Sequence, residues 1–98
     1  MYINMDKINE NNEQVFYKFY TSVIVGSYTT ESGKERNKLE TKYGVCIFNK
    51  KTHELVLDPG KTDAYFLDRS RERLAMLSKL LECSKTLDYP DRLDYASG

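Results

Sequence analysis

The sequence predicts a small α+β domain in which a three-stranded antiparallel meander is followed by one long amphipathic helix packed on one face of the sheet (β-β-β-α). Three observations predict this class. Segments with the alternation and composition of β-strands fill the middle of the chain, leucines recur at helical spacing after them, and a proline-glycine turn separates the two patterns. The 98 residues, 40% of them hydrophobic, are enough for one modest core.

The first predicted strand covers residues 15–28, where β-branched and aromatic residues dominate. Its more uniformly apolar face is expected to point at the core, and carries Val15, Tyr17, Phe19, Thr21, Val23 and Val25. The charged stretch at 31–40 is expected to be a long, exposed hairpin connection. Two shorter strands, 42–49 and 53–58, are joined by a polar turn and should pair as an antiparallel hairpin.

The helix is predicted over residues 64–83. It follows a turn at 58–61 whose proline in second place and glycine in third place match type II, and Thr62 or Asp63 can cap its first turn. The expected apolar stripe consists of Leu67, Leu74, Leu77 and Leu81, with Phe66, Met76 and Leu80 beside them. This stripe should lie across the sheet.

Both ends are expected to be tails. Residues 1–14 read as a disordered polar leader, 15–86 as the domain, and 87–98 as a tyrosine-rich tail that contains Leu-Asp-Tyr twice. Met5 is an alternative start. The chain shows neither a signal peptide nor an apolar run that could cross a membrane, and its two cysteines form no CxxC pair. We therefore expect a cytoplasmic protein that has reduced thiols and makes no membrane contact.

Motifs for chemistry are weak. Gly60-Lys61-Thr62 resembles the end of a phosphate-binding loop, but a leucine replaces the loop's first glycine. His53, the single histidine, neighbours a glutamate that points to the opposite strand face, which disfavours a metal site. Cys46 lies diagonally from His53 across the expected hairpin, so a small cysteine-dependent enzyme is the least favoured hypothesis. We predict a non-catalytic protein without cofactor or metal.

Net charge bears on whether the protein binds nucleic acid. Fifteen basic and fifteen acidic side chains cancel, which weakens the case for nucleic-acid binding. The charge is uneven, however, with acidic ends and a mildly basic body. A nucleic-acid-binding domain that uses sheet lysines and tyrosines is therefore the alternative hypothesis, with Lys18 and Lys42 beside Tyr20, Tyr28 and Tyr43.

The leading hypothesis rests on the sheet face that one helix leaves uncovered. It would carry Phe16, Tyr20 and Ile24, with Phe48 or Tyr43 from the next strand, and an exposed apolar face usually marks an association surface. We predict a non-catalytic protein-interaction module, a regulator, inhibitor or adaptor, that binds a protein partner or forms a homodimer. The candidate partner-binding residues are Phe16, Lys18, Tyr20, Tyr28, Tyr43, Phe48, Arg69, Arg73, Tyr89 and Tyr95.

Overall fold

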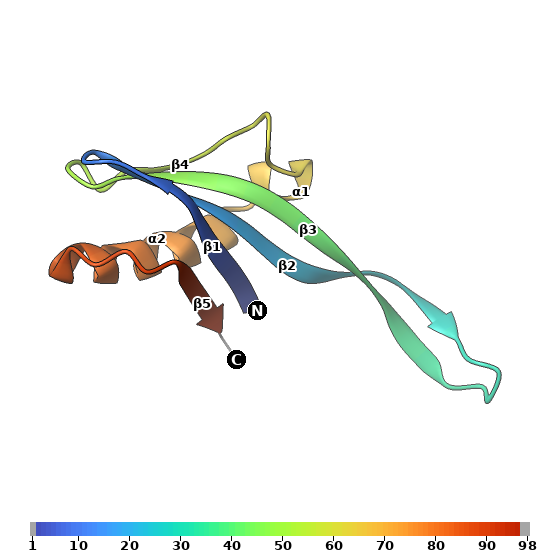
Figure 1. The fold of residues 1–98 in the computed structure, drawn as a ribbon. Coiled ribbons are helices and arrows are strands. Elements are labelled where there is room, and N and C mark those ends of the chain that lie inside the picture. The colour runs from blue at the N-terminus through green and yellow to red at the C-terminus, as the bar shows by residue number, and fades with distance from the viewer. Residues whose placement is uncertain (1, 97–98) are drawn as a thin grey trace.

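A five-stranded antiparallel sheet in the order β4-β3-β2-β1-β5 organises the molecule, with helices on one of its faces (Figure 1). The structure, a computed structural model, describes residues 2–96. The elements are β1 (Tyr2–Glu10), β2 (Gln14–Thr29), β3 (Glu35–Asn49), β4 (Leu55–Leu57), α1 (Ala64–Leu67), α2 (Ser70–Thr86) and β5 (Arg92–Ala96). The α+β class is as predicted, but the three-stranded meander with a single long helix is wrong.

The two segments expected as tails are the missing strands. β1 pairs with β2 on one side and with β5 on the other, so residues 2–10 and 92–96 of the two expected tails are strands of the sheet, while residues 1 and 97–98 lie outside the described part of the chain. Ile3 and Met5 of β1 are fully buried, and they face Tyr95 and Leu93 of β5 across the ladder. Polar residues alternate with these apolar ones on the opposite face, which is the pattern of a half-buried strand.

The predicted single helix is divided into α1 and α2. Asp63 caps α1, as one of the two predicted caps, and its Oδ1 accepts a hydrogen bond from the Tyr65 amide at 2.8 Å. Arg69 then adopts an extended conformation before α2 begins, and α2 continues three residues beyond the predicted end. The break lets Phe66 pack edge-to-face on Phe19 of the sheet at 4.8 Å between ring centroids.

The core lies between the helices and one sheet face. The prediction for β2 is confirmed at Val15, Tyr17, Phe19 and Thr21, which are all buried. The helix contributes Met76, Leu80 and Cys83 rather than the full expected leucine stripe, since Leu67 and Leu74 are exposed and Leu77 and Leu81 half-buried. A turn does form at 58–61, with the Lys61 amide donating to the Asp58 carbonyl, but Gly60 lacks the positive φ of type II.

The distal parts of β2 and β3 form a two-stranded arm that leaves the body of the molecule (Figure 1). We define the arm as residues 22–41. The expected connection at 31–40 is mostly strand, and only a short turn at 30–34, with Gly33 at φ 81°, remains. The molecule measures 55 × 26 × 21 Å and has a Cα radius of gyration of 15.7 Å, against about 13 Å for a compact chain of about 100 residues.

Candidate interaction surfaces on the sheet and the arm

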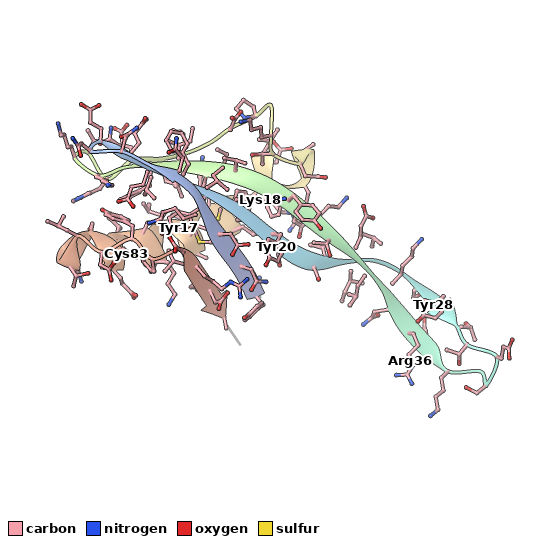
Figure 2. The ribbon with its side chains drawn as sticks, viewed as in Figure 1. Tyr17, Lys18, Tyr20, Tyr28, Arg36 and Cys83 are labelled. Carbon is pink, nitrogen blue, oxygen red and sulfur yellow. The ribbon has the colours of Figure 1, made fainter. Side chains whose placement is uncertain are left out.

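The sheet face away from the helices, called here the open face, brings together four of the candidate residues. Strand register places Phe16, Lys18 and Tyr20 of β2 on it, and Tyr43 of β3 lies directly opposite Tyr20. The two tyrosine rings are 6.0 Å apart, and the Lys18 ammonium is 5.0 Å from the Tyr43 ring centre. Lys18, Tyr20 and Tyr43 are therefore gathered in one cluster. Figure 2 shows Lys18 and Tyr20 at the part of the sheet from which the arm extends.

Charged side chains interrupt the apolar character of the open face. A row across the sheet runs from Arg92 of β5 through Asp6 of β1 to Lys18 of β2. Arg92 Nε lies 3.3 Å from Asp6 Oδ1, and this hydrogen bond raises the pKa of the arginine. The body part of the open face is therefore a mixture of paired charges and aromatic rings, and not a bare apolar patch.

Most of the remaining candidate residues lie elsewhere. Phe48 and Tyr89 are buried in the core with ring centroids 6.1 Å apart, and Tyr95 is half-buried opposite Ile3. Arg73 is exposed on α2. Tyr28 lies on the arm, far from the other tyrosines of the set (Figure 2).

The cysteine and histidine of the least favoured hypothesis are held in different environments. The expected diagonal placement of Cys46 and His53 requires Phe48 to pair with His53. It is wrong, because Phe48 pairs with Leu55 and Cys46 with Leu57. His53 is exposed and stacks on the Phe48 ring at 6.0 Å. Burial raises the pKa of the Cys46 thiol to about 12, so this side chain remains protonated at neutral pH.

A cleft of 330 Å³ lies where the arm meets the start of α2. Arg69, Arg71 and Glu72 line it from α2 and its N-cap, and β2 residues 21–24 form the opposite wall. The Arg69 guanidinium stacks on Tyr65 at 4.0 Å from the ring centre. Glu72 is only 6% exposed, and its Oε2 has no hydrogen-bond partner among the described residues.

The two faces of the arm differ in chemistry because side chains alternate along each strand. One face, the apolar arm face, continues the open face of the sheet. It consists of Ser22, Ile24, Ser27, Thr29, Glu35, Asn37, Leu39 and Thr41. Ile24 and Leu39 are direct cross-strand partners and are 64% and 62% exposed, and Glu35 is the single charge in this set.

The opposite face, the basic arm face, carries Val23, Gly26, Tyr28, Arg36, Lys38 and Glu40, with Lys34 just before β3. Tyr28 is 54% exposed and lies directly opposite Arg36. None of the three cations forms an ion pair within residues 2–96. Glu40 lies nearer the body on the same face, and its Oε1 forms an ion pair with Lys42 Nζ at 3.0 Å. The sequence signal for this segregation is the alternation of Lys34, Arg36 and Lys38 with other residue types.

The backbone of the arm also has free edges. The pairing of β1 with β2 ends at Tyr20, and beyond it the outer edge of β2 has no neighbouring strand in the described chain. Unpaired amide and carbonyl groups along such an edge can accept another strand. The arm therefore offers an apolar pair, a basic stripe and an open strand edge at one end of the molecule.

Comparisons with protein-family models, with curated proteins and with solved structures found no match for this chain. In the described residues, no helix has the length and hydropathy needed to cross a lipid bilayer, and no group of three or more acidic, cysteine or histidine side chains is arranged to hold a metal ion. Functional inference therefore rests on the geometry of the body and the arm.

Proposed function

We propose that the protein is a non-catalytic interaction module that forms a homodimer through the apolar arm face. The observation that carries the proposal is the exposed Ile24–Leu39 pair on a ribbon with no core behind it. An isolated two-stranded hairpin is marginally stable in water, so a second layer on the arm would stabilise it. Burial of such a side chain contributes about 1.5–3 kcal/mol.

Charge favours a second copy of this chain as the occupant. A two-fold contact brings each patch against itself, so a patch with several like charges repels its own copy. The apolar arm face has one charge, Glu35, near the arm's distal end, and an antiparallel contact would keep the two copies of this residue apart. The basic arm face is unsuited to such a contact, because it carries cations that form no ion pair with any described residue.

The proposal includes a reducing, cytoplasmic setting. Cys46 and Cys83 are both free and buried, and burial raises the pKa of each thiol. Buried thiols without a disulfide partner are typical of proteins from reducing compartments. The role of the dimer is that of a regulator or adaptor that presents the outer side of its arms.

Light scattering at two concentrations tests the dimer. We expect the wild-type mass to approach twice the 11.5 kDa of the chain as concentration rises. Ile24→Thr and Leu39→Thr keep strand propensity but remove the apolar contact, and each should shift the protein toward monomer. Val56→Thr is the matched control, because Val56 is a 53% exposed apolar residue of β4, away from the arm.

Two results would reject the homodimer. One is a wild-type protein that remains monomeric at every concentration, which would leave the apolar arm face to a different protein. The other is a dimer that both arm substitutions leave intact, which would move the contact to another surface.

A further inference from the structure

We infer that the basic arm face binds duplex DNA, with the arm lying in the major groove. This inference goes beyond the proposed dimer and uses the opposite face of the arm. It rests on Arg36 and Lys38, which lie on one side of a narrow ribbon, and on Lys34 in the turn just before β3. None of the three has an ion-pair partner among residues 2–96.

The zero net charge does not oppose this inference, because the fold separates the charges in space. The acidic C-terminal segment follows α2 and joins β5, and the end of α2 lies at the opposite end of the molecule from the tip of the arm (Figure 1). At physiological ionic strength, charges interact over only about 8 Å, so distant carboxylates cannot cancel the field of the arm. The arm itself carries three acids beside its three cations: Glu31 lies in the turn at the tip, Glu35 lies on the apolar arm face, and Glu40 is paired with Lys42 at 3.0 Å. Strand alternation separates Arg36 and Lys38 from Glu35, and it is this separation that leaves the cations together on one face.

The shape of the arm favours a DNA duplex over an RNA duplex. A two-stranded β-ribbon fits the major groove of B-form DNA, which is about 12 Å wide, whereas the major groove of an RNA duplex is too narrow for side chains to enter. Arg36 and Lys38 are two residues apart on β3, and their side chains therefore leave the strand about 7 Å apart along its axis. Tyr28, opposite Arg36 on β2, adds an exposed aromatic side chain to the same face.

Fluorescence anisotropy with a labelled DNA duplex of about 20 base pairs, titrated at several salt concentrations from about 50 mM, tests the inference. We expect binding whose log affinity falls with log salt at a slope near −3, because each phosphate contact contributes about −0.9. Arg36→Gln and Lys38→Gln should each reduce the slope by about 0.9 and weaken binding about tenfold at the lowest salt.

Lys51→Gln is the matched control. It removes the same charge from an exposed lysine in the β3–β4 turn, remote from the arm, and should leave the slope unchanged. Circular dichroism of each variant establishes that the body is folded. Ile24→Thr removes an apolar side chain of the proposed dimer contact and none of the cations. The slope of its log affinity against log salt, per chain, should equal that of the wild type. Loss of the dimer and loss of DNA binding can therefore be distinguished.

Three outcomes would overturn the inference. The first is an absence of binding to duplex DNA at about 50 mM salt, where the electrostatic contribution is strongest. The second is an equal effect of Lys51→Gln and Lys38→Gln, which would indicate attraction to the molecule as a whole. The third is equal affinity for an RNA duplex of the same length, which would exclude insertion into the major groove.

Discussion

Gly44 is the residue at which the core has no space for a side chain. It lies opposite Phe19 in the sheet, and a Cβ atom built on it would be 2.3 Å from Phe19 Cζ. The Phe19 ring therefore covers the glycine and packs on Phe66 beyond it. This arrangement ties the start of the helical layer to the centre of the sheet.

We expect Gly44→Ala to destabilise the protein by about 1–3 kcal/mol, because the phenylalanine ring must leave its position. Urea unfolding measures this change. Gly26→Ala is the control, because a Cβ at Gly26 meets no atom within 4 Å. Similar effects of the two substitutions would show that the contact with Phe19 does not set the cost.

Cys46 makes the free energy of unfolding depend on pH in the alkaline range. Its thiol has a pKa of about 12 in the folded protein, whereas an unfolded cysteine ionises near about 8.5. The folded state therefore retains a proton that the unfolded state loses, and stability falls as pH rises from the lower pKa toward the higher one.

We expect wild-type protein to lose about 2 kcal/mol more than Cys46→Ala between about pH 7 and about pH 10, as measured by urea unfolding at each pH. Comparison with the variant removes the contribution of Tyr17, whose pKa is also raised by burial. Parallel pH profiles for the two proteins would mean that the thiol ionises freely in the folded state.

Among the elements, α2 ends in a residue poorly suited to its conformation. Leu87 is the C-cap and has φ 55° and ψ 27°, in the left-handed region, and its side chain is exposed. Left-handed conformation costs a non-glycine residue about 1–2 kcal/mol. Its amide nevertheless closes the helix by donating to the Cys83 carbonyl.

Leu87→Gly should therefore raise the free energy of unfolding by up to about 1 kcal/mol. Leu87→Ala separates the causes, because it removes the exposed side chain and leaves the strained backbone in place. We expect a thermal melt to rank glycine above alanine. Equal melting temperatures for Leu87→Ala and Leu87→Gly would show that the gain comes from removal of the exposed leucine side chain.

Individual strands also show how much of the fold the sequence could predict. The core face of β2 was predictable because Val15, Tyr17 and Phe19 alternate over a long segment. β1 and β5 were not, because each offers only two inward apolar residues, and their strand conformation depends on pairing with neighbours distant in the chain. The arm strand 35–40 has no apolar alternation, and it forms because β2 extends opposite it.

At the scale of the whole molecule, the candidate surface was the harder part to predict. The sequence indicates Tyr28 as a candidate, but it places Arg36, Lys38 and Leu39 in an expected loop, where no face can be defined. Once the arm is a ribbon, alternation alone divides these residues between two faces. The body and the arm then differ in kind, since the body buries a core and the arm buries almost nothing.

This division predicts that the arm can be removed without loss of the body. Val23 and Glu40 are cross-strand partners, so residues 24–39 can be replaced by an Asn-Gly turn that suits a two-residue hairpin. Because the buried residues of the core lie outside this segment, we expect the free energy of unfolding to change by less than about 1 kcal/mol. Small-angle X-ray scattering should show a radius of gyration near that of a compact chain, about 12–13 Å.

The shortened protein should also be monomeric and bind no DNA, because both arm faces are absent. Cooperative unfolding similar to wild type is essential to this interpretation, and urea unfolding establishes it. A variant that fails to fold would show that the arm belongs to the folding unit. A folded variant that still dimerises would place the contact on the body, where Tyr20, Tyr43 and the Arg92–Asp6–Lys18 row form the remaining open face.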